Sequence, residues 1–179
     1  MCYIYLRLIN SFLFSFNLFP ENITYGGALL LSDRNGDVDI TNCTFRQNSI
    51  VNGLGGAVCI IRQNLVDISN CTFEDNSVAI GNGGALYVDN DNTVALRDLI
   101  FVRNTAIAGS GGSVYCNSRN YLPMCERLLF VENKAGKSGG ALSFGTNNVN
   151  VVVSNCAFYR NAAGLSGELV VSYVTDKEY

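Results

Sequence analysis

Two short motifs alternate at a fixed spacing along almost the whole chain, and this spacing constrains the fold more than any other feature. The first is Gly-Gly-Ala plus an apolar residue, or a close variant, with copies beginning at Gly26, Gly55, Gly83, Gly111, Gly139 and Ser166. The second is Phe-x-x-Asn, with copies beginning at Phe45, Phe73, Phe101, Phe130 and Phe158. Successive copies lie 27 to 29 residues apart. One structural unit copied about five times predicts a solenoid rather than a globular fold.

The apolar residues within one unit predict three short strands. In the unit that starts at Gly83, apolar residues alternate with others over 84–88, 94–96 and 99–101, and a period of two indicates strands. The odd step from Leu96 to Leu99 breaks the alternation, so the chain must turn a corner at Asp98. Three other units have Asn at this position, namely Asn42, Asn70 and Asn155. Asn and Asp tolerate the left-handed backbone that such a corner needs.

Three strands separated by tight corners and repeated about every 28 residues predict one fold class. This is an all-β parallel β-helix of about five coils, in which each strand pairs with its equivalent about 4.8 Å away along the axis. Helical solenoids fit poorly, because Gly pairs, Asn, Thr and Val dominate and no capped amphipathic run is present.

The motif residues have structural roles in such a coil. The glycine pairs, whose second members are Gly27, Gly56, Gly84, Gly112 and Gly140, let the backbone pass a sharp corner. The Phe residues form a core ladder, each stabilising the fold by roughly 1.5–3 kcal/mol through burial. A second ladder consists of Asn48, Asn76, Asn104, Asn133 and Asn161. An amide can bond the coils above and below, whereas stacked carboxylates would repel, so these Asn residues are interpreted as structural.

Composition and charge exclude several classes. With 48% hydrophobic and 15% charged residues the chain is too apolar to be disordered. The net charge is −3 and no long run of either sign occurs, which argues against nucleic acid and anionic membrane as primary partners. The chain has no His and no Trp, so it lacks the commonest general base and the best sugar-stacking side chain.

The seven cysteines show no Cys-x-x-Cys spacing that would indicate zinc. Three of them, Cys43, Cys71 and Cys156, share a repeat position with Leu99 and Leu128, which indicates a buried apolar slot. Two others, Cys116 and Cys125, bracket the irregular excursion 117–124. A disulfide between them would pin this excursion in an oxidising compartment.

The division into domains follows from the repeats. An apolar N-terminal segment covers residues 1–18, the repeat domain covers 19–174, and a polar tail covers 175–179. Three interpretations of the first segment stay open. It is a secretory signal, a membrane anchor, or an incomplete first coil that leads into Phe19 and Asn22 as an earlier Phe-x-x-Asn copy.

With these motifs in view, the chain resembles the repeats of the chlamydial polymorphic outer membrane proteins, whose hallmark is GGA[ILV] together with FxxN. The resemblance spans about residues 19–171, with intact first motifs at Gly26, Gly55, Gly83 and Gly139. It implies a right-handed parallel β-helix that is secreted or surface-exposed and serves adhesion rather than catalysis. The chain departs from the pattern at Ser113, Ser166 and Glu168.

A carbohydrate-active β-helix is the enzyme alternative. It would need clustered carboxylates, or Asp ligands for calcium beside a basic residue, and no cluster is visible along the sequence. The best candidate is the stretch Asp33–Asp39, where oxygen ligands fall at alternate positions. It lacks the glycine and the distal Glu of a calcium loop, so a solvated turn is the competing interpretation. No cofactor, metal or catalytic residue is therefore assigned.

Outward positions of the first strand are expected to be Leu30, Cys59, Tyr87, Tyr115, Ser143 and Val170. Here Tyr87 and Tyr115 stand on adjacent coils, as a stacking platform for a sugar or as simple packing between coils. Sequons for glycosylation occur at Asn22, Asn42 and Asn70. The last two coincide with the corner, so Asn22 is the freer candidate.

These features predict a non-enzymatic β-helical module at the cell surface or outside the cell. Its faces would bind an unknown protein or glycan or act as a spacer, with a membrane reached only through the N-terminal segment. Solenoid ends without polar caps expose parallel strand edges, so self-association is also expected.

Overall fold

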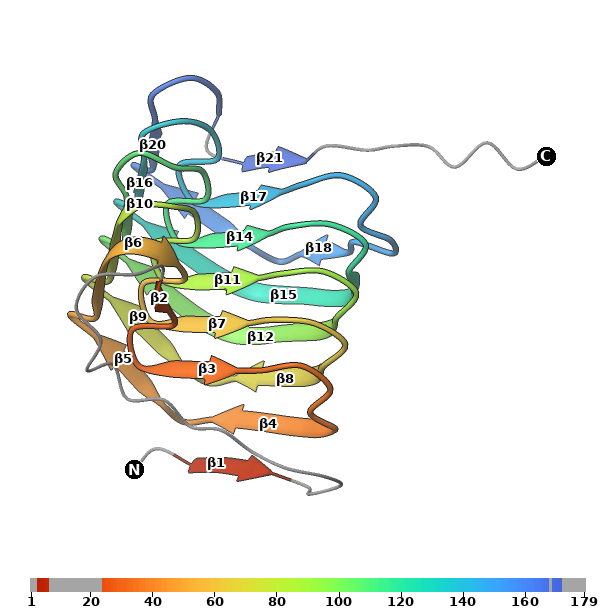
Figure 1. The fold of residues 1–179 in the computed structure, drawn as a ribbon. Coiled ribbons are helices and arrows are strands. Elements are labelled where there is room, and N and C mark those ends of the chain that lie inside the picture. The colour runs from red at the N-terminus through yellow and green to blue at the C-terminus, as the bar shows by residue number, and fades with distance from the viewer. Residues whose placement is uncertain (1–2, 7–23, 168, 172–179) are drawn as a thin grey trace.

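The computed structural model describes residues 3–6, 24–167 and 169–171. These residues form a parallel β-solenoid of about five stacked coils (Figure 1). Strands of successive coils pair in parallel, for example Leu86 with Val58 on one side and with Val114 on the other, each 28 residues away. The described residues contain no helix, so the predicted fold class is confirmed.

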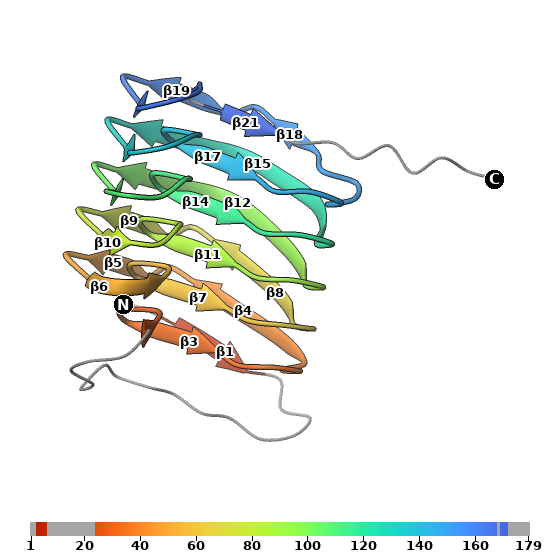
Figure 2. The same cartoon turned by 45° about the horizontal axis from the view of Figure 1, so that its top comes forward.

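The strands form three sheets that run along the axis (Figure 2). The first contains β3 (Leu29–Leu31), β7 (Val58–Ile60), β11 (Leu86–Val88), β14 (Val114–Cys116), β17 (Leu142–Phe144) and β21 (Leu169–Val171). The second contains β1 (Tyr3–Leu6), β4 (Asp37–Thr41), β5 (Thr44–Arg46), β8 (Leu65–Ser69), β9 (Thr72–Glu74), β12 (Thr93–Val102), β15 (Tyr121–Val131), β18 (Val153–Ser154) and β19 (Ala157–Tyr159). The third contains β2 (Thr24–Tyr25), β6 (Ser49–Leu54), β10 (Ser77–Ile80), β13 (Thr105–Ala106), β16 (Lys134–Ala135) and β20 (Ala162–Ala163).

The third sheet adds to each coil a short strand that was not predicted, which we call the fourth strand. In β12 and β15, in contrast, the predicted second and third strands run on as one. The fourth strand follows each Asn of the Phe-x-x-Asn motif, and it was missed because two to six residues without strong apolar alternation carry little strand signal. Each coil turns at four or five positions with positive φ, which include the predicted glycine and Asn or Asp corners. The predicted corner residues Asn42, Asn70, Asp98 and Asn155 have φ between 51° and 55°, and Arg127 takes this position in the remaining coil.

The core is built from stacked equivalent side chains. Phe45, Phe73, Phe101, Phe130 and Phe158 form a continuous ladder with ring centroids 4.8 to 4.9 Å apart. The three central rings are fully buried. The predicted inward pairs of the first and second strands, such as Leu86 with Val88 and Val94 with Leu96, are also buried.

The predicted Asn ladder is present and extends further than expected. In Asn104 the backbone N–H and Nδ2 both donate to Oδ1 of Asn133 on the next coil, at 2.9 and 3.1 Å. The same Nδ2 donates to the carbonyl of Phe73 on the preceding coil, at 2.9 Å. The ladder therefore satisfies backbone groups at the corner as well as linking side chains.

A second buried ladder of the same kind was not predicted. It consists of Asn35, Asn64, Asn92, Asn120 and Asn148, and each backbone N–H of the first four donates to Oδ1 of the next at 2.9 to 3.0 Å. The spacing of 28 or 29 residues was visible in the sequence. No repeated motif residue such as Phe accompanies these Asn residues, so the sequence pattern indicated only a set of polar turns.

The glycine pairs occupy corners that exclude side chains. Gly83 has φ of 68°, and a Cβ on Gly84 would lie 2.1 Å from the carbonyl oxygen of Gly112. In the last copy, Gly167 rather than Ser166 takes the positive φ, at 43°. Leu169 still pairs with Leu142, as the motif start at Ser166 predicts, so the corner of this copy is one residue shorter than in the others.

The excursion predicted over 117–124 is also corrected. β15 begins at Tyr121, and its register against β12 shifts by one residue between the pairs Thr93–Tyr121 and Ala95–Met124. The extra residue is a β-bulge, which accounts for the step of 29 residues from Phe101 to Phe130.

The two ends of the solenoid differ. At the first end β1 pairs with β4 antiparallel, with Tyr3 opposite Thr41, and occupies that edge. In the last coil Val151, Val153 and Phe158 are only partly buried. The predicted boundaries at 18 and 174 and the role of the first segment stay predictions, because 7–23 and 172–179 lie outside the described residues.

Candidate binding groove

The outer face of the first sheet differs from the prediction. Of the side chains expected to point to solvent, Cys59 is fully buried and Tyr87 is 4% exposed, while Ser143 is also buried. The reason is the close approach of the glycine corners. A Cβ on Gly55 would lie 3.2 Å from Cβ of Tyr87, so the backbone before the strands folds against this face.

The predicted tyrosine platform exists as a stacked pair that is largely closed to ligands. The rings of Tyr87 and Tyr115 stack at 5.7 Å with an interplanar angle of 8°. The Tyr87 hydroxyl donates to Oδ1 of Asp89 at 3.3 Å. Burial raises the pKa of Tyr87 well above its usual value, and the neighbouring Asp89 carboxylate raises it further. Packing between coils is therefore the role that the structure gives this pair.

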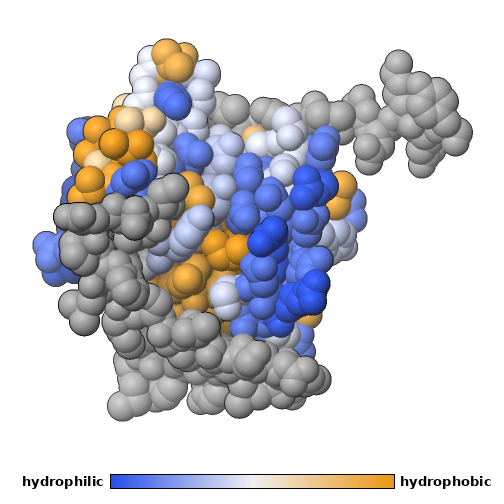
Figure 3. Space-filling view, viewed as in Figure 1, coloured by the Kyte–Doolittle hydropathy of each residue, from blue (hydrophilic) through white to orange (hydrophobic). Residues whose placement is uncertain are grey.

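An open groove lies on the outer side of β3 and next to the two ends of β7, where Leu54 precedes that strand and Ile61 follows it, and we call it the groove on β3 and β7. Its volume is about 630 Å³. It is lined by Tyr25, Leu30, Ser32, Asp33, Leu54, Ile61, Arg62 and Asp89. Figure 3 shows apolar surface over these strands beside a hydrophilic stripe over the corner that follows them. Sequence reasoning missed the groove because Tyr25 and Leu54 belong to the third sheet, whose strands were not predicted.

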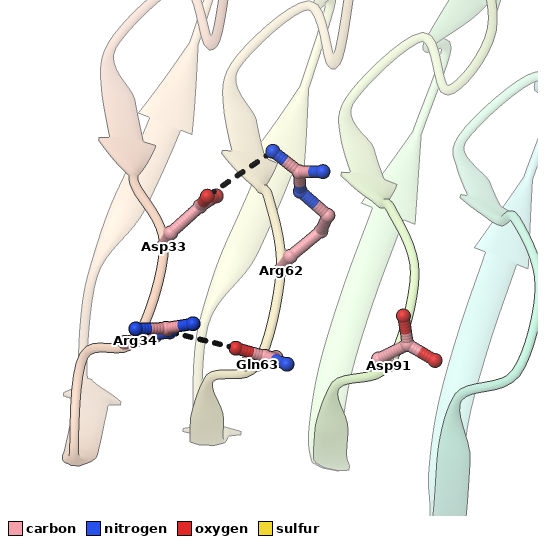
Figure 4. A pocket seen from close by; sticks show the side chains of 5 residues that line it. All are labelled: Asp33, Arg34, Arg62, Gln63 and Asp91. Atoms are coloured by element: carbon pink, nitrogen blue, oxygen red, sulfur yellow. Dashed lines mark hydrogen bonds and ion pairs between the residues drawn. The ribbon is translucent and has the colours of Figure 1, made fainter.

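The hydrophilic stripe is a set of charges paired between coils (Figure 4). Arg62 binds Asp33 at 3.2 Å, and Nε of Arg34 donates to Gln63 at 2.9 Å. A second hollow of about 440 Å³ is lined by Asp33, Arg34, Arg62, Gln63 and Asp91. Ion pairing across coils partly offsets the left-handed backbone at this corner, which costs roughly 1–2 kcal/mol for a non-glycine residue.

The electrostatics of the stripe are balanced pair by pair. Asp91 accepts two hydrogen bonds from Arg119, at 2.8 and 3.0 Å. The Arg119 hydrogen bonds hold the pKa of Asp91 below its usual value, and the charge of Arg62 acts in the same direction. Carboxylates held ionised in this way serve recognition better than proton transfer at neutral pH.

The calcium-loop interpretation of Asp33–Asp39 does not fit the geometry. Asp33 pairs with Arg62, whereas Asn35 is buried and its Nδ2 donates to Asn64 Oδ1 at 3.0 Å. Asp37 and Asp39 lie on β4 and line a different groove. Among the described residues no group of His, Cys, Asp or Glu side chains is arranged to hold a metal ion.

That other groove, on the outer face of β4 and β8, does gather carboxylates from two coils. It has a volume of about 370 Å³, and its lining includes Asp37, Asp39 and Asp67. Asp39 and Asp67 are direct neighbours in the parallel register, and Asp67 is paired with Arg97. The sequence showed no cluster because these residues are 28 apart, although the repeat spacing places them side by side.

The cysteines are buried packing residues in most coils. Cys71 is buried in the predicted apolar slot and its thiol donates to the carbonyl of Ser69 at 3.1 Å. Cys43, at the same position, is disulfide-bonded. The predicted disulfide between Cys116 and Cys125 is wrong, because both are free and buried. They lie on different strands, β14 and β15. The chain between them belongs to the coil, so it does not need a disulfide to hold it in place.

Two of the three predicted glycosylation sequons lie in the part of the chain that the structure describes. Asn42 and Asn70 have exposed side chains, so the corner depends on their backbone conformation rather than on a buried amide. Asn22 lies outside the described residues. The prediction that favours Asn22 therefore stays a prediction.

The fold and its ladders define a repeat protein of the parallel β-solenoid class. Residues 70–89 match the family model of the Chlamydia polymorphic membrane protein repeat. This stretch runs from the corner Asn70 through the Phe73 motif and the Gly83 pair to Asp89, so both predicted motifs lie inside it. Comparisons with curated proteins and with solved structures found no match. Within the described residues, no helix is long and apolar enough to span a bilayer.

Proposed function

We propose that this chain is a non-catalytic β-helical module, secreted or exposed at the cell surface, that binds a protein or glycan through the groove on β3 and β7. The match of residues 70–89 to a polymorphic membrane protein repeat supports a surface-associated role. The proposal concerns this face of the solenoid and leaves the chemical identity of the partner to experiment.

The groove carries the proposal. Its floor and walls include Leu30, Leu54 and Ile61, and the rim carries Asp33 and Arg62. Concave sites with apolar walls and a few polar groups are typical of binding sites. The ring of Tyr25 is 39% exposed beside the groove, which leaves one aromatic side chain available for contact.

Binding to a surface partner tests the proposal. The full chain is applied to a glycan array and to intact epithelial cells, together with the variants Tyr25→Ala and Leu54→Ser. Leu65→Ser is the matched control, because Leu65 is 47% exposed but lines the groove on β4 and β8. Loss of binding in the two groove variants and retention in the control is the expected result. Equal binding by all four proteins would refute the groove as the site.

A carbohydrate-active role is the second candidate, favoured by the carboxylates on β4 and β8. Asp39 and Asp67 lie side by side there, and Arg97 is ion-paired with Asp67, which offers two carboxylates for acid and base roles and one cation of fixed charge. The test is release of reducing or unsaturated ends from an acidic polysaccharide by the wild type and by Asp39→Asn. Release that depends on Asp39 would establish this candidate and overturn the non-catalytic proposal.

A further inference from the structure

One edge of the solenoid carries an exposed apolar side chain on four of its five described coils. We define the fourth-strand edge as residues 49–54, 77–82, 105–110, 134–139 and 162–167, which include β6, β10, β13, β16, β20 and the loops that follow them. On this edge Val51 and Leu165 are each 76% exposed, Ile107 is 61% exposed and Ile80 is 60% exposed. In Figure 3 apolar side chains gather over this part of the molecule, at the upper left. Exposed apolar side chains gathered on one edge in this way mark an interaction surface, although the coil of 134–139 contributes none of them.

The charge of the edge differs from that of the other faces. No Asp or Glu occurs in its residues, and it holds Lys134 and Lys137. Both lysines are exposed, and neither forms an ion pair with any described residue. The described arginines, in contrast, bond a carboxylate or an amide, mostly on a neighbouring coil. The net charge of −3 therefore conceals an edge whose charge is positive and not neutralised within the described chain.

The backbone of the edge is already satisfied. Ile107 N–H donates to the carbonyl of Val78 at 2.9 Å, and Ala108 N–H donates to that of Ala79 at 3.0 Å. Leu165 N–H likewise donates to the carbonyl of Lys137 at 2.7 Å. Loops normally carry free peptide groups, which are costly to move out of water. Bonding between coils removes much of that cost here, so these loops are suited to an apolar medium.

The shape of the edge favours a fluid partner over a folded one. The apolar tips are separated by Gly, Ala and Ser, and the coil of 134–139 carries Lys134 and Lys137 in their place. Val51, Ile80, Ile107 and Leu165 line none of the three grooves described above. A specific protein interface typically covers about 800 Å² of each partner with a complementary face, whereas a row of loop tips is narrow.

We propose that the fourth-strand edge lies against a lipid surface that carries anionic headgroups. The apolar tips enter the boundary between headgroups and acyl chains, and Lys134 and Lys137 extend to the lipid phosphates. The edge and the groove on β3 and β7 share Leu54, but none of the four exposed apolar side chains and neither lysine lines that groove, so the two roles can be tested separately. The proposed role makes the module a peripheral membrane contact without a spanning segment.

Flotation with lipid vesicles tests the proposal on the full chain. One vesicle type is phosphatidylcholine mixed with phosphatidylglycerol, and the other is phosphatidylcholine alone. The variant Ile80→Ser/Ile107→Ser is expected to bind the mixed vesicles more weakly, by about tenfold for each side chain removed. The control is Ile100→Ser/Leu129→Ser, which removes two exposed apolar side chains from the outer face of β12 and β15 and leaves binding unchanged.

A lysine variant gives an independent readout. Lys134→Gln/Lys137→Gln keeps the apolar tips and is expected to abolish the preference for the mixed vesicles. If the serine variant lost its circular dichroism signal, this lysine variant alone would decide the question. Failure of the wild type to float with either vesicle, or equal weakening by the control pair, overturns the proposal. Light scattering that shows a dimer dissolved by Ile80→Ser/Ile107→Ser in the absence of lipid also overturns it, because the edge is then an interface between copies.

Discussion

Nδ2 of Asn104 donates to Oδ1 of Asn133, 3.1 Å away on the next coil, and Oδ1 of Asn104 in turn accepts from the backbone and the side chain of Asn76. Asn104→Leu removes these bonds, so the Asn76 N–H loses its acceptor and the Phe73 carbonyl loses the Asn104 amide, whereas Nδ2 of Asn76 keeps its bond to the Phe45 carbonyl. We expect a loss of about 1–3 kcal/mol for each group left unsatisfied. Urea denaturation measures this loss of unfolding free energy. The control is Thr44→Ala, which changes an exposed side chain on β5. A change smaller than that of the control would show that the ladder does not stabilise the fold.

The Phe ladder gives a second prediction. Phe101 is fully buried between two stacked rings, so Phe101→Ala is expected to destabilise the fold by about 3–5 kcal/mol through lost burial and a cavity. Its neighbour Ile100 is 41% exposed, and Ile100→Ala should cost far less. Tyr87→Ala is also expected to be costly, because Tyr87 is buried although it lies on the outer face of its strand. Equal midpoints for the Phe101 and Ile100 variants in urea would contradict the burial pattern.

The coil could be predicted because its signals repeat. Phe73 and Asn76 recur together in every unit, so one error in a single unit does not disturb the register of the others. The burial of Tyr87 could not be predicted, because it depends on how closely the Gly55 corner approaches, and period two assigns only alternate faces. The bulge in β15 was hidden for a related reason, since one extra residue does not change composition.

The groove sites depend on register between coils more than on local sequence. Asp39 and Asp67 become neighbours only once the repeat of 28 is applied to polar outward positions as well as to the motifs. The same step would have found the second Asn ladder through Asn64, Asn92 and Asn120. Tyr25 and Leu54 meet through the third sheet, and their pairing across β2 and β6 had no sequence signal.

Cysteine reactivity tests the corrected disulfide. Burial raises the pKa of Cys116 well above its usual value and raises that of Cys125 to about 12. Both thiols are therefore expected to react slowly with iodoacetamide in the native protein and rapidly after denaturation. Peptide mass spectrometry follows each site, and the half-buried Cys156 serves as the internal comparison. A peptide pair linked through Cys116 and Cys125 in the native protein would contradict the structure.

Acid should weaken the ion pairs between coils. Hydrogen bonds from Arg103 hold the pKa of Asp75 below its usual value, and the charge of Arg46 adds to this effect. A depressed folded pKa means that the stabilisation is present above the unfolded pKa of about 3.9 and is lost as the pH falls through the folded pKa. The urea midpoint of the wild type should therefore fall across this range, and the fall should be smaller in Asp75→Asn. Asp37→Asn, an exposed carboxylate in no ion pair among the described residues, should leave the slope unchanged.

The last described coil predicts association between copies through its partly buried core positions. Val151, Val153 and Phe158 are only partly buried there. Their equivalents in an inner coil, in the same order Val94, Leu96 and Phe101, are fully buried. Partly exposed core positions beside a parallel edge provide a template for another strand, while β1 already occupies the β4 edge at the other end. Light scattering of the purified chain should show concentration-dependent association, and a short amphipathic capping helix appended after residue 179 should suppress it. The variant Ile80→Ser/Ile107→Ser should associate like the wild type, which separates this contact from the fourth-strand edge. A monomer at high concentration would show that the last coil is sealed within its own chain.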